Sequence, residues 1–194
     1  MMIEVPPRVR GLIFDCDGTL ADTMPTHWKA WHETFAAYGK TCPHVFLERC
    51  MGVPSREIVR LYNEAFGENF DPRQFSAEKD RRSLAGLASV GPIPPVVEVV
   101  RRFRGKLPMA VASGGIRMNV ETALAAIGLT DCFETILTAD DDVPPKPSPA
   151  IFIEAARRLK VDPQNCQVFE DGEAGMEAAR QAGMIVTDIR PYLK

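Results

Sequence analysis

The chain has 194 residues, of which 45% are apolar and 25% are charged, and its formal net charge is −3. This length is enough for one sizeable core with a smaller insert, and the composition is typical of a soluble globular protein. The small negative charge argues against broad electrostatic binding of nucleic acid, and no apolar run approaches the ~20 residues of a membrane span. The N-terminal stretch lacks a signal-peptide pattern, so we expect a cytoplasmic protein with no membrane partner and, by default, a monomer.

The five cysteines are scattered along the chain and show no CxxC spacing. This pattern argues against a zinc site or a disulfide framework, and without an export signal it predicts reduced thiols. Cys16, which stands between two aspartates, is expected to point its side chain into the core.

Short apolar runs alternate with segments of helical periodicity along most of the chain. The runs are typical of buried parallel strands and cover residues 12–14, 109–112, 135–137, 167–169 and 184–186. Helical spacing covers about 116–127, 148–160 and 173–182, with Gly128 and Gly183 where helix C-caps are expected. Strands alternating with helices predict an α/β fold with a doubly wound, Rossmann-like parallel sheet.

The stretch between residues 23 and 90 breaks this alternation. It contains no convincing strand, and residues 25–38, 54–66 and 72–87 have helical patterns. The Gly- and Pro-rich residues 91–95 resemble a hinge that returns the chain to the sheet. We therefore predict a core domain of residues 1–22 and 91–194, interrupted by a helical cap domain of residues 23–90.

Two carboxylates, Asp15 and Asp17, come directly after the first predicted strand, and Gly18 permits a tight turn after them. In open α/β sheets, ligands bind at the carboxyl ends of the strands. An Asp-Gly turn on its own is common, so the interpretation depends on the residues at the ends of the other strands.

Polar residues are also found at the ends of three further predicted strands. Ser113 and Gly114 come after the second strand, and a hydroxyl with glycine N–H groups can cradle a phosphate. Lys146 comes after the third strand through an acidic loop, and Glu170 and Asp171 come after the fourth. Carboxylate oxygens are the ligands that Mg²⁺ prefers. The sequence thus predicts a Mg²⁺ site formed by Asp15, Asp17, Glu170 and Asp171, with a phosphoryl group bound by Ser113, Gly114 and Lys146.

These residues resemble the four ordered motifs of the haloacid dehalogenase superfamily. The motifs are the stretch from Asp15 to Thr23, then Ser113-Gly114, Lys146-Pro147 and Glu170-Asp171, and they span nearly the whole chain. A helical cap placed after the first motif is similar to the beta-phosphoglucomutase-like subfamily. Within that subfamily, residues 25–31, 52–55 and 182–190 resemble the bacterial fructose-1-phosphate (6-phosphogluconate) phosphatases.

The resemblance implies a role for each motif residue. Asp15 would attack phosphorus to form an aspartyl-phosphate, while Asp17 would first protonate the leaving oxygen and then deprotonate the attacking water. Mg²⁺ would be held by Asp15, the backbone carbonyl of Asp17 and Asp171, with Glu170 close to it. The phosphoryl group would be held by Ser113 and Lys146.

The chain departs from the family pattern at three positions that carry no reacting group. Cys16 stands between the two aspartates, where an apolar residue is common. Gly172 stands where a small hydroxyl residue often comes after Glu-Asp, and we expect it to loosen that loop. Ala150 stands where many members of the family have an aspartate.

Residues of the predicted cap are expected to contribute to substrate binding. His27 is interpreted as an active-site contact near the leaving group, with a partly exposed helix histidine as the alternative. Arg56, next to Ser55, is interpreted as a contact for a polar substrate tail, with an ordinary residue at a helix N-terminus as the alternative. Trp28 and Trp31 are expected to pack within the cap, with Trp31 facing inward.

Residues 140–142 form an Asp-Asp-Asp run on the loop that carries Lys146. Such a run can be mistaken for a metal cluster, and we expect a solvated turn instead. Thr23 and Pro92 are the expected hinge positions for cap closure.

Three functions are compatible with this set of residues. The first is a Mg²⁺-dependent phosphatase of small phosphorylated metabolites such as fructose 1-phosphate. The second is a beta-phosphoglucomutase-type isomerase, in which a sugar hydroxyl rather than water would discharge the phosphorylated Asp15. The mutases typically carry a lysine just before the cap-loop glycine, where this chain has Met51, so we favour the phosphatase. The third function, a non-catalytic binding protein, is disfavoured by the intact acidic set.

Overall fold

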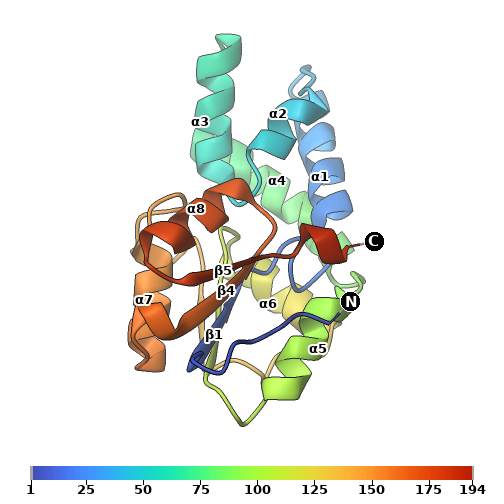
Figure 1. The fold of residues 1–194 in the computed structure, drawn as a ribbon. Helices are drawn as coiled ribbons and strands as arrows, with labels where there is room; N and C mark the ends of the chain where they lie inside the picture. The colour runs from blue at the N-terminus through green and yellow to red at the C-terminus, as the bar shows by residue number, and fades with distance from the viewer. Residues whose placement is uncertain (1, 194) are drawn as a thin grey trace.

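A parallel five-stranded sheet lies at the centre of the computed structural model, which describes residues 2–193. The strand order is β3-β2-β1-β4-β5, so β1 lies in the middle with β2 and β4 as its neighbours. This arrangement confirms the predicted parallel sheet (Figure 1). The strands are β1 (Gly11–Phe14), β2 (Met109–Ala112), β3 (Thr135–Leu137), β4 (Cys166–Glu170) and β5 (Ile185–Asp188).

Helices cover both faces of the sheet, as a doubly wound fold requires. Leu12 and Phe14 pack on one face against α5 (Pro94–Phe103) and α6 (Arg117–Ala126). Ile13 points to the other face, against α7 (Ala150–Leu159) and α8 (Glu173–Gln181), because successive side chains of a strand alternate. Two short 3₁₀ turns, η1 (Pro163–Asn165) and η2 (Arg190–Tyr192), complete this part of the chain.

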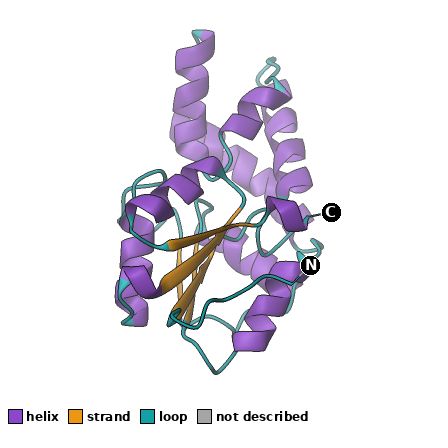
Figure 2. Cartoon of the chain, viewed as in Figure 1, coloured by secondary structure: helices purple, strands orange, loops and turns teal. Residues whose placement is uncertain are grey.

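Helices α1 to α4 stand together beyond the carboxyl ends of the strands, as Figures 1 and 2 show. They have a hydrophobic core of their own, in which Phe35 packs against Trp31, Tyr62, Phe70 and Phe75. The division into a core and a cap domain at residues 22 and 90 stays a prediction. The helices are α1 (Met24–Ala37), α2 (His44–Arg49), α3 (Ser55–Phe66) and α4 (Pro72–Leu87).

The helix boundaries are set by local chemistry. Gly128 and Gly183 adopt the left-handed backbone conformation (φ +71°) after α6 and α8, as expected for C-caps. Helix α5 is missing from the sequence-based prediction, because Pro94 and Pro95 resemble part of a hinge. Proline is favoured in the first helical turn, where its missing N–H has no partner, and these two prolines begin α5.

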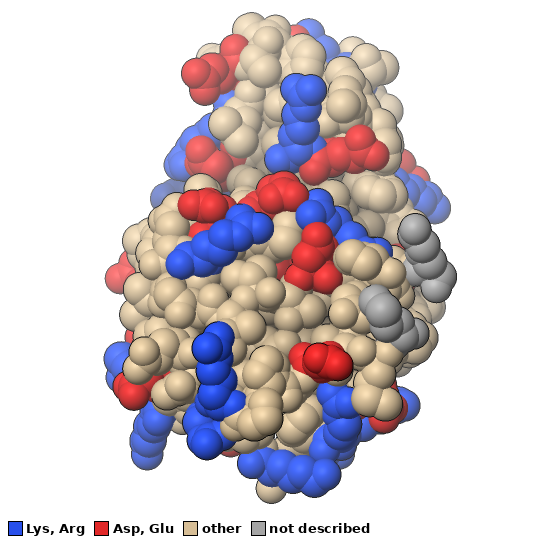
Figure 3. Space-filling view, in the orientation of Figure 1, with Lys and Arg blue, Asp and Glu red and all other residues tan. Residues whose placement is uncertain are grey.

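Charged side chains of both signs are interspersed on the face shown in Figure 3, and many gather where helices α1 to α4 meet the sheet domain. Among residues 2–193, none of the helices is both long and apolar enough to span a membrane.

We predict that Phe35→Ala lowers the free energy of unfolding by about 3–5 kcal/mol, because it leaves a cavity in the aromatic cluster of α1 to α4. Denaturant unfolding followed by tryptophan fluorescence measures this loss. Val45→Ala serves as the control: Val45 is an exposed apolar residue of α2, and its truncation is expected to change stability by less than about 0.5 kcal/mol. Equal effects of the two substitutions would contradict the assignment of Phe35 to a packed core.

Candidate active site

A buried ionic cluster lies at the carboxyl ends of β1 and β4. The Nζ atom of Lys146 lies 2.7 Å from Oδ1 of Asp15 and 2.5 Å from Oε1 of Glu170. All three side chains are almost completely removed from solvent. Parallel strands end at one edge of the sheet, and this is why residues that are far apart in sequence meet here. The cluster unites three of the predicted site residues.

Asp171 extends this cluster. One carboxylate oxygen of Asp171 lies within 4.8 Å of one carboxylate oxygen each of Asp15 and Glu170. These three residues form a set able to hold a metal ion. The donors are held in place, because Thr19 Oγ1 donates to Asp171 Oδ1 at 3.0 Å and the backbone N–H of Gly172 donates to Glu170 Oε2 at 2.8 Å. Three carboxylates face one ammonium group, so a divalent cation would restore neutrality. Hard oxygen donors of this kind fit Mg²⁺.

Burial and the neighbouring charges shift the pKa values of the ionisable groups in the cluster. Burial raises the pKa of Asp15 well above its ordinary value, although the nearby Lys146 ammonium opposes the shift. Burial, with the neighbouring Glu170 charge, raises the pKa of Asp171 to about 7. Burial would lower the pKa of Lys146, but the carboxylates of Asp15 and Glu170 outweigh it and raise that pKa. Lys146 is therefore a permanent cation of the site.

Asp17 lies beside the acidic cluster, and its carboxylate takes part in a different set of contacts. Its Oδ1 accepts hydrogen bonds from Thr23 Oγ1 at 2.7 Å and from the His27 ring at 3.0 Å. Burial alone would raise the pKa of Asp17, but these two neighbours hold it below the ordinary range. Its other oxygen, Oδ2, lies toward Gly115, where an added Cβ would stand 3.2 Å from it. The expected metal contact through the Asp17 carbonyl stays a prediction.

His27 is buried beside Asp17 and lines the cavity, whereas its contact with the leaving group stays a prediction. Its ring is oriented by a residue that the sequence analysis missed. Lys79, a buried residue of α4, brings its Nζ to 3.0 Å from Nδ1 of His27. An ammonium group only donates hydrogen bonds, so Nδ1 of His27 is the acceptor. The ring proton is therefore on Nε2, which donates a hydrogen bond to Asp17. The available signal was a lysine on the buried stripe of a helix, which by itself does not reveal which group the lysine faces.

The predicted phosphate loop lies directly under the cap. Ser113 is buried after β2, and its Oγ accepts a hydrogen bond from the N–H of Gly115 at 3.0 Å. A Cβ on Gly114 would come within 2.7 Å of the carbonyl oxygen of Gly52, which belongs to the loop between α2 and α3. Gly114 thus permits a close approach of the helical cap to the sheet edge.

A cavity of about 80 Å³ connects these parts, and its wall includes Asp15, Asp17, His27, Ser113 and Gly114. Trp31 is buried in the aromatic cluster and faces inward, as expected, with Trp28 less buried beside the cavity. Arg56 is not part of this wall. It is exposed and lines a neighbouring cavity of about 340 Å³, which shares Ser55, Asp80, Ser113 and Gly114 with the first. This second cavity also reaches Lys146, and the substrate contact of Arg56 stays a prediction.

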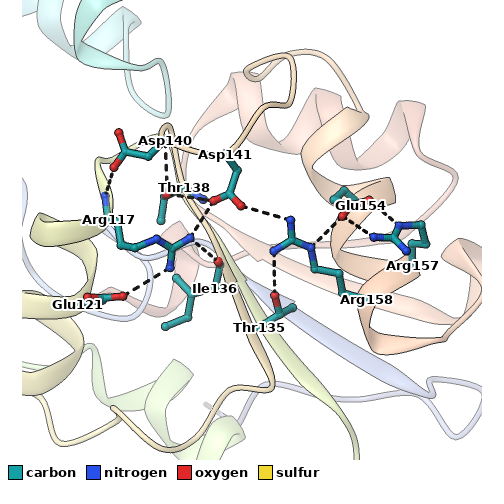
Figure 4. A network of polar contacts seen from close by, with 10 residues as sticks. All are labelled: Arg117, Glu121, Thr135, Ile136, Thr138, Asp140, Asp141, Glu154, Arg157 and Arg158. Carbon is teal, nitrogen blue, oxygen red and sulfur yellow. Dashed lines mark hydrogen bonds and ion pairs between the residues drawn. The ribbon is translucent and has the colours of Figure 1, made fainter.

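The expectation of a solvated turn is wrong for Asp141. Its side chain is 14% exposed and accepts hydrogen bonds from the backbone N–H and hydroxyl of Thr138, from Arg117 and from Arg158 (Figure 4). Asp140 accepts from the backbone N–H of Arg117 at the start of α6. The reason is positional: the run leaves β3 between two helices whose arginines face it. Asp141 therefore ties the Lys146 loop to α6 and α7.

Gly172 also differs from the expectation. The loop is not loose, because its N–H is bonded to Glu170, and a Cβ at this position would approach the carbonyl oxygen of Met51 to 3.1 Å. A residue without a side chain fits under the cap loop here.

Comparison with known proteins identifies the family. The model of the haloacid dehalogenase-like hydrolases matches residues 9–183. The chain belongs to this family. It is 40% identical over 185 residues to the fructose-1-phosphate phosphatase YqaB of Escherichia coli (strain K12), covering 94% of this chain and 97% of that protein. It is 32% identical to the phosphorylated carbohydrates phosphatase of Thermotoga maritima, covering 91% and 82%.

Solved structures of the same family have the same fold. CbbY of Rhodobacter sphaeroides, solved in complex with phosphate, superposes with a TM-score of 0.82 at 27% identity, covering 93% of this chain and 86% of that chain. The beta-phosphoglucomutase of Clostridium difficile has a TM-score of 0.82 at 24% identity, covering 96% and 93%, and shows the fold alone. With its relatives, the chain is a phosphoric monoester hydrolase of the haloacid dehalogenase type.

We predict that Asp141→Asn lowers the free energy of unfolding by about 1–2 kcal/mol at pH 7, because charge-assisted hydrogen bonds to Thr138 and two arginines are lost. Burial would raise the pKa of Asp141, but these contacts lower it below its ordinary 3.8. Its contribution is therefore complete above about pH 4 and is lost as the pH falls through the lowered value. Denaturant unfolding between pH 7 and pH 3 measures the effect.

Asp142→Asn is the matched control, because Asp142 is the exposed neighbour in the same run. We expect it to change stability by less than about 0.5 kcal/mol at either pH. An equal loss in both variants would show that Asp141 acts only through net charge.

Proposed function

We propose that the enzyme is a Mg²⁺-dependent phosphatase of small sugar phosphates, with fructose 1-phosphate as a representative substrate, and that it acts through an aspartyl-phosphate on Asp15. The observation that supports this most directly is the position of Asp15. Its carboxylate lies at the end of the central strand, paired with Lys146, within the acidic set and beside Asp17. The names of the relatives in Escherichia coli and Thermotoga maritima support the substrate class.

The proposed reaction has two balanced steps. An Asp15 oxygen attacks phosphorus, the ester P–O bond breaks, and Asp17 gives its proton to the leaving oxygen. A water molecule then attacks the same phosphorus, Asp17 takes its proton, and phosphate leaves with Asp15 regenerated as a carboxylate. Asp17 is an anion in the free site, so it takes up one proton from solvent when the negative phosphoryl group binds beside it and raises its proton affinity. The second step returns a proton from water to Asp17, so no net proton is used in a cycle.

Asp15, Glu170 and Asp171 would hold Mg²⁺, which supplies charge stabilisation to the phosphoryl oxygens when it is bound. Ser113, the N–H group of Gly114 and Lys146 are proposed to bind the remaining phosphoryl oxygens. Each group reduces the negative charge that builds up in the transition state.

The catalytic cavity, at about 80 Å³, is well below the ~300 Å³ at which typical small-molecule sites begin. We therefore propose that helices α1 to α4 move away from the sheet edge to admit substrate, and that they close over it to exclude water. The hinge roles of Thr23 and Pro92 belong to this proposal.

The function is tested by incubating the enzyme with fructose 1-phosphate, with and without Mg²⁺, and in parallel with β-glucose 1-phosphate plus its bisphosphate. We expect release of inorganic phosphate from fructose 1-phosphate that stops on chelation and returns with added Mg²⁺. Fast isomerisation of the glucose phosphate with little free phosphate would instead identify an isomerase.

We predict that Asp15→Asn lowers kcat by about 10⁴-fold or more, because the amide cannot act as the nucleophile. Circular dichroism is expected to show an unchanged fold, since an amide oxygen can still accept from Lys146. Asp142→Asn is the activity control, because Asp142 is exposed and lines neither cavity. Phosphatase activity that persists in Asp15→Asn would overturn the covalent mechanism.

A further inference from the structure

Asn119 lies in the first turn of α6, and its amide orientation is fixed by its surroundings. Its side chain is only 3% exposed, and its Nδ2 donates to Ser83 Oγ of helix α4 at 3.2 Å. The Ser83 hydroxyl gives its own hydrogen to the carbonyl oxygen of Asp80 at 2.9 Å. Ser83 must therefore accept from Asn119, so the amide nitrogen faces Ser83 and the amide oxygen faces elsewhere.

The amide oxygen of Asn119 is buried and has no hydrogen-bond partner among residues 2–193. An unpaired acceptor in a protein interior costs free energy and calls for an explanation. Asn119 is part of the wall of the catalytic cavity, and a bound substrate is therefore a candidate partner for this acceptor.

The cavity wall near Asn119 is the side on which the leaving group is expected. Oδ1 of Asp17 is used by Thr23 and His27, whereas Oδ2 lies toward Gly115. The oxygen that Asp17 protonates therefore lies on the side of Gly115, and Asn119 lines the same cavity as Gly115. A group attached to the leaving oxygen would meet the Asn119 amide.

The neighbouring polar atoms show which chemistry would complete this wall. Lys79 uses two of its three N–H groups on His27 and Asp80, and Asp80 uses Oδ1 for Lys79 and Ser55. This leaves one donor on Lys79, one acceptor oxygen on Asp80 and the acceptor of Asn119 along α4 and α6. Hydroxyl groups, which both donate and accept, are the natural partners of such a set.

We propose that Asn119 is a specificity-determining residue whose amide oxygen accepts a hydrogen bond from a hydroxyl on the leaving group. The preferred substrates are then polyhydroxylated phosphate esters, and esters without a hydroxyl at this point leave the acceptor unpaired. The inference rests on the proposed phosphatase function and adds to it the group that selects the substrate.

The test compares kcat/KM for fructose 1-phosphate and for p-nitrophenyl phosphate, whose leaving group has no hydroxyl donor. We expect Asn119→Leu, which removes the acceptor at similar volume, to lower the value for the sugar phosphate tenfold or more. The value for p-nitrophenyl phosphate is expected to change less than threefold. Met118→Leu is the matched control, because Met118 is the exposed neighbour on the same helix, and it should leave both values unchanged.

A series of monodeoxy sugar phosphates gives an independent measurement. In the unmodified enzyme, kcat/KM for one analogue is expected to fall below that for the full sugar phosphate by about the factor that Asn119→Leu causes. In the variant, the same analogue should show no further decrease in kcat/KM. Asn119→Ala repeats the measurement if the leucine variant does not fold.

The outcomes separate the two proposals. If the enzyme hydrolyses neither substrate, the proposed sugar-phosphate phosphatase function is wrong. If it hydrolyses both and the variant loses both equally, or keeps its preference, Asn119 is a structural residue and this inference is wrong.

Discussion

The candidate active site depends on the contact of the Lys146 ammonium with Asp15 and Glu170. A charge removed from water is costly unless partners at hydrogen-bond distance compensate it, and removing one partner of such a group typically costs about 3–5 kcal/mol. The two carboxylates come from β1 and β4, and the lysine comes from the loop after β3. The cluster therefore requires the parallel sheet to bring these strand ends together, and Asp141 to hold the lysine loop against α6 and α7.

The meeting of these residues at the strand ends was predictable from sequence because it follows from topology, whereas the role of each residue was implied only by the family resemblance. Parallel strands place the residues at their carboxyl ends along one edge, so Asp15, Ser113, Lys146 and Glu170 had to lie near one another once the strands were recognised. Short strands of Val, Ile, Leu and Phe and well-placed glycines made that recognition possible.

The residues that sequence analysis missed lie on helices whose rotation is set by tertiary packing. Lys79 and Ser83 lie on the buried side of α4, and Asn119 lies on the buried side of α6. Periodicity identifies such positions as buried and does not say which neighbour they face. Asp141 was misinterpreted for a related reason: an acidic run is expected to be solvated until the arginines of two other elements are placed around it.

The strand ends and helices α4 and α6 are proposed to bind different parts of the substrate. The strand ends collect more negative charge than Lys146 balances, which suits a divalent cation and a phosphoryl group that are the same for every substrate. We propose that helices α4 and α6 contribute the groups that distinguish one ester from another, and the two helices meet at the Asn119–Ser83 hydrogen bond. An acceptor kept unpaired at this contact lowers stability, and such a cost is typical of groups that proteins retain for function. Under the proposal for Asn119, substrate selection takes place where α4 touches α6, next to the strand ends that are proposed to hold the phosphoryl group.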